Sequence, residues 1–244
     1  RPGTEGALAL AMTDVAITEK LFDESFMRQW TNGTFLVRRD NGAALTEADL
    51  SPGGSLSRYV AWDEIGDALL LYDSASGSYE RQAARLALAG ERRVVTRDGR
   101  EIACEPAFAR LASLAAQFTP EISTQTTWVP AAKVREAVHV LAANRPVSMF
   151  MHNGVGQHTN ATQTSRAIAT FYALFGNFDQ PGGNVVFPKA PLNTVSGKEF
   201  LPKEMALQRI GRERKPLGPP AKPGNCAAYD IFTAVLDDRP YPVK

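Results

Sequence analysis

The chain has 244 residues, and its 27 basic and 26 acidic residues leave a formal net charge of only +1. This balance gives no strong field for nucleic acid or an anionic membrane surface, which argues against a polyanion-binding function. Hydrophobic residues make up 44% of the sequence, and no stretch reaches the roughly 18–20 consecutive apolar residues that a transmembrane helix needs. We therefore expect a soluble protein with room for one α/β domain or two smaller ones.

The first predicted helix runs from about Glu5 to Glu19. Its apolar stripe consists of residues at helical spacing, namely Ala7, Leu8, Ala11, Met12 and Val15. Thr4 is placed to cap this helix, and Glu5 lies in its first turn, where a carboxylate complements the helix dipole. A second, shorter helix is predicted over residues 21–28.

A β-rich insertion is predicted over residues 58–99. Apolar and polar residues alternate at 59–62, 68–72, 84–88 and 93–96, with turn residues between these segments. No catalytic constellation falls within it. Helical periodicity then returns at 104–117 and again after Pro130, which suits the first position of a helix.

Cys104 and Cys226 are far apart and form no Cys-x-x-Cys pair, so we expect two incidental thiols rather than a metal or iron–sulfur site.

The centre of the chain, residues 147–184, reads as strand, glycine turn, helix and second glycine turn. Val147, Met149 and Met151 lie in a short apolar run that predicts one buried strand of a parallel sheet. A helix is predicted over residues 165–175, with Gly176 as its left-handed C-cap. Since ligands of open α/β sheets bind at the carboxyl ends of strands, the turn between strand and helix is the candidate site.

That turn is rich in glycine and in polar side chains, which are Asn153, Gly154, Gly156, Gln157 and His158. Free amides and amide side chains of this kind can hydrogen-bond an anion or a heterocycle. The alternative is a tight turn with solvated side chains, because the dinucleotide fingerprint needs a third glycine where Thr159 stands. No Asp, Glu or Cys lies in the loop, so His152 and His158 predict no metal site.

Beyond Asn184 the pattern predicts a short strand at 185–187 and a basic, Pro- and Gly-rich loop from Lys198 to Gly224. This loop is either a connector or part of an anion-binding wall. A last helix is predicted from Tyr229 to Leu236.

Two blocks of sequence carry a family resemblance. One is Gly154-Val155-Gly156-Gln157-His158-Thr159-Asn160-Ala161-Thr162-Gln163-Thr164 with the later Gly176-Asn177-Phe178-Asp179-Gln180-Pro181-Gly182-Gly183-Asn184. The other is Arg1-Pro2-Gly3-Thr4-Glu5-Gly6-Ala7-Leu8-Ala9-Leu10-Ala11-Met12, in which Glu5 stands where the family usually has Asp. Together they resemble the molybdopterin oxidoreductases of the dimethyl sulfoxide reductase superfamily.

The resemblance implies a cofactor, bis-molybdopterin guanine dinucleotide with molybdenum or tungsten. It implies that Gly3, Thr4 and Glu5 line the guanosine end of one cofactor, where a carboxylate can accept two guanine hydrogens. It further implies that Asn153 and Gln157 contact a pterin or pyrophosphate beside Gly154 and Gly156, with Gln157 nearer the metal. His158 would stabilise a phosphate, orient a substrate oxygen or bond a neighbouring carbonyl. Asn193 resembles a family position facing the cofactor cavity.

The expected fold class is α/β, with Rossmann-like parallel sheet layers, flanking helices and the small β-rich excursion. Residues 1–156 would belong to one cofactor-binding domain and residues 157–244 would begin a second. The chain starts inside a family block without an initiator Met, so we expect an internal fragment of a longer prokaryotic catalytic subunit, periplasmic or cytoplasmic. The family's metal ligand and 4Fe-4S cysteines would lie outside it, so the fragment is expected to be inactive alone, with no catalytic or metal-binding residue of its own.

The implied partners are the remainder of the catalytic chain, an iron–sulfur electron-transfer subunit and a small substrate, whose conversion would move two electrons or an oxygen atom. Two other functions remain open. The strand, glycine turn and helix would also suit an NAD-type dehydrogenase, although the missing glycine and the absence of an acidic residue about 20 positions on count against it. The absence of an acid, base and nucleophile constellation would suit a noncatalytic nucleotide-binding or scaffold module.

Overall fold

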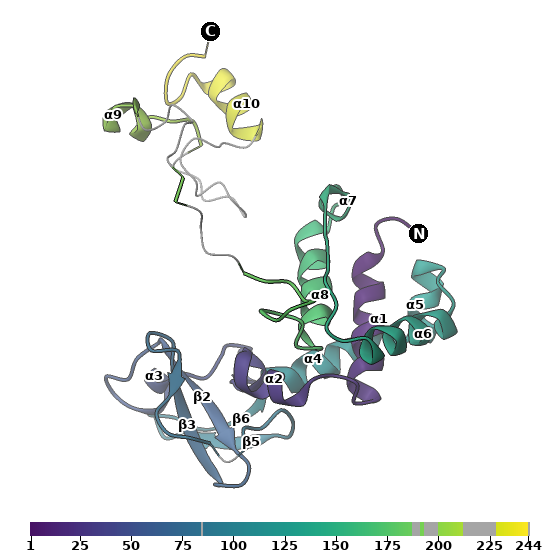
Figure 1. The fold of residues 1–244 in the computed structure, drawn as a ribbon. Coiled ribbons are helices and arrows are strands. Elements are labelled where there is room, and N and C mark those ends of the chain that lie inside the picture. Colours follow the sequence, from purple (N-terminus) through teal and green to yellow (C-terminus); the bar gives the residue numbers. More distant parts are fainter. Residues whose placement is uncertain (84, 187–190, 193–199, 212–227, 244) are drawn as a thin grey trace. The chain divides into compact units, whose positions relative to one another are not determined.

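The computed structural model describes residues 1–83, 85–186, 191–192, 200–211 and 228–243 (Figure 1). The chain divides into two compact units, Arg1–Val186 and Phe187–Lys244. The domain boundary between residues 156 and 157 remains a prediction.

One half of the first unit is helical. Its helices are α1 (Glu5–Thr18), α2 (Glu24–Trp30), α4 (Ala107–Ala115), α5 (Pro120–Thr127), α6 (Ala131–Ala143), α7 (Asn153–Gly156) and α8 (Ala161–Ala173), with 3-10 turns at Asn32–Thr34 and Ala116–Phe118. The helices predicted near the N-terminus, after Pro130 and at 165–175 are therefore present, within a few residues of their expected ends. Gly176 has φ +65°, as its predicted role at the helix end requires.

Helix α1 is the centre of this half, because it packs against α4, α5, α6 and α8 (Figure 1). Its small buried residues, Ala9, Ala11 and Ala16, allow close approach on more than one side. The largest apolar cluster joins Val15 of α1 to Val138 of α6 and Phe171 of α8. The amino terminus is thereby fixed against α8, which follows the predicted turn.

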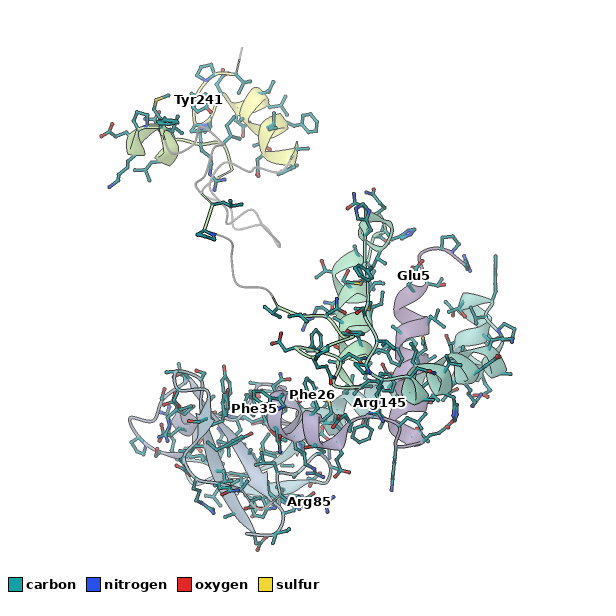
Figure 2. All side chains as sticks on the ribbon, viewed as in Figure 1. Glu5, Phe26, Phe35, Arg85, Arg145 and Tyr241 are labelled. Carbon is teal, nitrogen blue, oxygen red and sulfur yellow. The ribbon has the colours of Figure 1, made fainter. Side chains whose placement is uncertain are left out.

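The other half of the first unit holds two three-stranded antiparallel sheets with the strand orders β1-β6-β5 and β2-β3-β4. The strands are β1 (Leu36–Arg38), β2 (Arg58–Asp63), β3 (Ala68–Asp73), β4 (Ser78–Tyr79), β5 (Arg92–Val95) and β6 (Glu101–Pro106), and the short helix α3 (Glu47–Leu50) precedes β2. Leu36, Val60 and Ile102 lie in the cluster between the sheets. Phe35 and Arg85 both lie in this half (Figure 2).

The strands expected at 59–62, 68–72 and 93–96 are formed, whereas no strand is formed at 85–88, and the helix expected over 104–117 is present but starts later than expected. At residues 85–88 Leu86 forms an isolated bridge to Asp63, and residue 84 of the expected strand lies outside the described residues. The helix expected from Cys104 begins at Ala107, because Ile102, Cys104 and Pro106 are buried alternately, as the period of a strand requires. Burial raises the pKa of the Cys104 thiol to about 11, which suits an inert core residue.

The strand predicted at 147–151 is not formed, and the sheets among the described residues are antiparallel. Instead of a neighbouring strand, side chains of Asn177, Asn184 and Tyr172 bond the backbone of Val147 and Met149. At 185–186 the chain is likewise irregular, beside a single parallel bridge between Phe178 and Asn184. The fold is thus a mixture of helices and sheets, without the expected parallel layers in the described ranges.

The second unit contains α9 (Lys203–Leu207) and α10 (Ala228–Asp237). Helix α10 confirms the last predicted helix, whereas α9 lies inside the stretch predicted to be loop. Within the described ranges, every helix is too short or too polar to cross a bilayer.

Candidate functional site

The predicted glycine turn lies at the start of α8 and is open to solvent. Asn153, Gly154, Gly156, Gln157 and His158 are all exposed, and Asn153–Gly156 form the single turn α7. Figure 1 shows α7 and the N-terminal end of α1 at the same end of α8. The turn is therefore not sealed under apolar side chains.

The two sequence blocks meet at this end of the unit. A Cβ atom placed on Gly3 would lie 3.5 Å from Nδ1 of His158, and one on Gly6 would lie 3.2 Å from Oγ1 of Thr164. Gly3 has φ +82°, which a residue with a side chain rarely adopts. The first residues of the chain and the turn more than 150 positions later thus form one surface, which we call the α1–turn surface: Gly3, Thr4, Glu5 and residues 153–158.

Glu5 supplies the negative charge of the α1–turn surface (Figure 2). Its Oε1 accepts a hydrogen bond from the Gly3 N–H at 3.2 Å. Hydrogen bonding from its own backbone N–H, then from that of Gly3, together with the charge of His158, lowers the pKa of Glu5 despite partial desolvation. The carboxylate is consequently ionised at neutral pH.

Thr4 does not cap α1 as expected, since its side chain makes no capping hydrogen bond. Its hydroxyl instead donates to the carbonyl of Arg1 at 2.5 Å. Arg1 is held in turn, because its terminal amine donates to the carbonyl of Thr127 at 2.9 Å. These bonds fix the segment before α1 against the end of α5.

Gly154 and Gly156 leave open space above the turn. A Cβ at either position would meet no atom within 4 Å, and neither residue has a left-handed φ. Gly154 and Gly156 therefore do not produce a sharp turn through a left-handed backbone conformation. Their contribution is a bare backbone that another molecule can approach closely.

Sequence reasoning missed three residues that lie near the end of α8, away from the turn. Tyr172, Asn177 and Asn184 bond the backbone of the segment that leads into α7. Both asparagines flank the second glycine turn of the sequence, and this position is the feature from which their role could have been predicted. Asn193, the remaining predicted site residue, lies outside the described residues.

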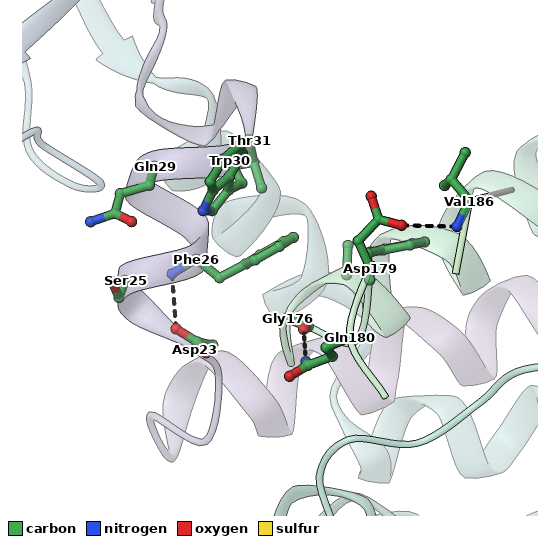
Figure 3. A pocket seen from close by; sticks show the side chains of 12 residues that line it. Asp23, Ser25, Phe26, Gln29, Trp30, Thr31, Gly176, Asp179, Gln180 and Val186 are labelled. Atoms are coloured by element: carbon green, nitrogen blue, oxygen red, sulfur yellow. Dashed lines mark hydrogen bonds between the residues drawn. The ribbon is translucent and has the colours of Figure 1, made fainter. Parts of the chain in front are cut away.

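A separate pocket of about 810 Å³ lies at the other end of α8 (Figure 3). Its walls come from α2 and from the chain after α8, and include Phe26, Trp30, Phe178 and Asp179. Its two carboxylates are engaged, since Asp23 accepts from the Phe26 N–H at 2.8 Å and Asp179 from the Val186 N–H at 2.9 Å. The 13 residues of α8 place it ~20 Å from the predicted turn.

The described residues contain no group of three or more His, Cys, Asp or Glu side chains that could hold a metal ion. Exposed amide side chains, a carboxylate and bare backbone dominate the α1–turn surface. Such a surface can accept and donate hydrogen bonds to a heterocycle or a phosphate, but within the described ranges it offers no acid, base and nucleophile set.

No protein-family model matches the chain. Perchlorate reductase subunit alpha from Dechloromonas aromatica (strain RCB) is 31% identical over 85% of this chain and 24% of the relative. Dopamine dehydroxylase from Eggerthella lenta is 25% identical over 100% of this chain and 32% of the relative. Dimethylsulfide dehydrogenase subunit alpha from Rhodovulum sulfidophilum is 29% identical over 75% of this chain and 20% of the relative.

The chain thus spans between 20% and 32% of the length of these relatives. Among solved structures, acetylene hydratase from Pelobacter acetylenicus aligns with a TM-score of 0.55 at 18% identity, over 100% of this chain and 27% of that one. At that identity the structural match supports a shared fold alone.

Proposed function

We propose that this chain, which belongs to the molybdopterin oxidoreductases of the dimethyl sulfoxide reductase superfamily, binds part of a molybdopterin guanine dinucleotide through the α1–turn surface. The meeting of Gly3 with His158 carries the proposal, because two motifs far apart in sequence face one exposed surface. The complete protein would use this cofactor for two-electron or oxygen-atom transfer on a small substrate.

The guanosine end is assigned to Gly3, Thr4 and Glu5. An ionised carboxylate can accept the N1 and N2 hydrogens of guanine as a bidentate pair, and the lowered pKa of Glu5 keeps it ionised. Glu5 has one more methylene than the family's usual Asp. The Gly3 N–H takes one of the two lone pairs of Oε1, so each carboxylate oxygen can still accept one of the two guanine hydrogens.

The pterin or pyrophosphate end is assigned to Asn153, Gly154, Gly156, Gln157 and His158. Their exposure and the open space over the glycines suit a large, flat ligand with phosphates. The bound metal and pterin would supply the electron-transfer chemistry, while these residues bind and orient the cofactor. Asn193 is proposed as a further contact on the basis of the family resemblance.

We also propose the finer features of the family for the longer protein. A Rossmann-like parallel sheet would be present there, in a domain ending near residue 156, with residues 157–244 beginning the second cofactor domain. A second guanine dinucleotide, molybdenum or tungsten, a 4Fe-4S cluster and an electron-transfer subunit would complete the assembly. Metal analysis and pterin fluorescence on the longer protein test the pterin cofactor and the metals.

The direct test is titration of the chain with GDP, guanosine and NAD by calorimetry. We expect GDP to bind, and Glu5→Gln to weaken its binding ~10–100-fold, because hydrogen bonds to a charged group contribute about 1.5–3 kcal/mol. Glu5→Asp keeps the carboxylate and should retain most of the affinity. Glu136→Gln is the matched control, since Glu136 is exposed on α6 and its carboxylate accepts a hydrogen bond from Lys133 at 2.6 Å.

Each contrary result identifies a different function. Binding of NAD without GDP would favour a dehydrogenase, and binding of neither would favour a scaffold module. Equal GDP affinity in the Glu5→Gln and Glu136→Gln variants would show that Glu5 does not contribute to GDP binding.

A further inference from the structure

We infer that Tyr172, Asn177 and Asn184 are positioning residues that hold the segment 147–149 and so fix the cofactor-facing turn at residues 153–158. We call these three residues the amide clamp. The inference rests on the proposed function for the identity of the ligand, but the ordering of the turn can be measured without any ligand.

The amide clamp replaces a neighbouring β-strand. Asn184 Oδ1 accepts from the Met149 N–H at 2.7 Å, and Asn184 Nδ2 donates to the Met149 carbonyl at 3.0 Å. One side-chain amide therefore satisfies both backbone groups of Met149, as a residue on an adjacent strand would.

Val147 is held in the same way two positions earlier. Its N–H donates to Asn177 Oδ1 at 3.2 Å, and its carbonyl accepts from the Tyr172 hydroxyl at 2.6 Å. Residues 147 and 149 of an extended chain direct their backbone groups to the same side, so a single row of side chains reaches both. Ser148 adds a bond from its hydroxyl to the Gly182 carbonyl at 2.8 Å.

The clamp is itself rigidly supported. Tyr172 is 4% exposed and Asn177 is fully buried. Asn177 Nδ2 donates to the Tyr172 carbonyl at 3.3 Å, and the Asn184 N–H lies 3.0 Å from the Asn177 carbonyl oxygen and 3.1 Å from the Tyr172 hydroxyl. Buried polar groups that satisfy one another in this way define a single arrangement.

The bonds from the clamp to Met149 are the last hydrogen bonds before the turn among the described residues. Among the described residues, none forms a hydrogen bond with Phe150 or Met151, and Phe150 is 93% exposed. The chain runs from the clamp, near the end of α8, back to α7 at its start (Figure 1). The position of α7 therefore depends on the clamp on one side and on α8 on the other.

A purely structural role would lower stability without changing the turn selectively. We therefore pair each clamp variant with the same substitution at a residue that loses one side-chain hydrogen bond in another part of the molecule. Tyr172→Phe is matched by Tyr79→Phe, whose hydroxyl lies 2.9 Å from Thr34 Oγ1 in the β-rich half. Asn184→Ala is matched by Asn144→Ala, whose amide donates to the Val140 carbonyl at 2.7 Å.

Hydrogen–deuterium exchange of residues 147–158, thermal unfolding and affinities for GDP and guanosine are measured on the whole chain. In Tyr172→Phe and Asn184→Ala we expect exchange of the hydrogen-bonded amides of Val147, Met149 and Gln157 to rise about three- to tenfold, since loss of a single bond of this kind corresponds to about that factor. GDP affinity should fall by about the same factor, whereas guanosine affinity, which depends on Glu5, should fall less. The control variants should change neither quantity.

Unchanged exchange at 153–158 in both clamp variants, or equal losses of GDP and guanosine affinity that follow thermal stability, would overturn the inference and leave the proposed function intact. Failure of the unmodified chain to bind GDP would instead contradict the proposed function. The exchange measurement would then still decide whether the clamp fixes the turn.

Discussion

At the scale of single residues, the glycines of the two turns have different surroundings. Gly154 faces open space, whereas a Cβ on Gly183 would lie 2.1 Å from the carbonyl oxygen of Asn177. The first glycine keeps a surface bare, and the second allows two backbones to approach closely. Sequence alone presents both as the same turn signal, because the atoms that distinguish them are distant in the chain.

This difference predicts that two alanine substitutions change the free energy of unfolding by very different amounts. Gly183→Ala should lower the free energy of unfolding by about 3 kcal/mol, because the backbone of Asn177 must move. Gly154→Ala should change it by less than about 0.5 kcal/mol, while weakening GDP binding by obstructing the turn. Urea unfolding and calorimetry measure both, and a stable Gly183→Ala protein would show that the turn can rearrange without cost.

At the scale of elements, helices with a continuous apolar stripe were predictable. α8 and α10 each have such a stripe, whereas the apolar residues of α1 lie on all sides of the helix; the presence of all three needed no knowledge of distant residues. The segment 147–151 shows the limit of that reasoning. Its apolar run predicted a buried strand, but none of residues 147–151 is buried, and asparagine side chains take the place of a neighbouring strand.

The candidate site likewise contains residues that the sequence predicts and residues that only distant contacts reveal. The residues of the α1–turn surface were named from the sequence, and the structure places Gly3 beside His158 at the start of α8, whereas the predicted site residue Asn193 lies outside the described residues. Their role in binding a cofactor stays a prediction. The role of Tyr172 could not be predicted, since a tyrosine in an apolar helical stripe reads as core. Its hydroxyl acts on a residue 25 positions earlier, which only the folded chain reveals.

The turn between β5 and β6 provides a prediction for pH dependence. The Thr96 hydroxyl, followed by the Arg100 guanidinium, lowers the pKa of Asp98 to about 2. The carboxyl is ordinary when unfolded, at ~3.9. Because the folded pKa is the lower one, its stabilising effect is complete above pH ~4 and disappears as the pH falls toward about 2.

Unfolding midpoints of the unmodified protein and of Asp98→Asn should therefore differ most near neutral pH and converge as the pH approaches about 2. The effect at neutral pH should be small, since Asp98 is exposed to solvent. Arg93→Gln, on the exposed face of β5, is a control that leaves the Asp98 turn intact. A constant difference across the acid range would mean that Asp98 titrates normally.

At the scale of the whole molecule, the chain can be divided experimentally at two places. The predicted domain boundary follows residue 156, whereas the first compact unit extends to Val186. A cut after 156 removes α8, and with it Phe171, Leu174 and Phe175, which are 7%, 0% and 2% exposed in the main apolar cluster. Burial of side chains this large contributes about 1.5–3 kcal/mol each.

A chain of residues 1–186 should therefore unfold cooperatively, with the same urea midpoint as the corresponding transition of the full chain. A chain of residues 1–156 should lack that transition, since the loss approaches the roughly 5–15 kcal/mol that stabilises a typical domain. Circular dichroism during urea titration distinguishes the two. Cooperative unfolding of 1–156 at the full-chain midpoint would show that α1 and its neighbours form a stable core without α8, and would favour the predicted boundary.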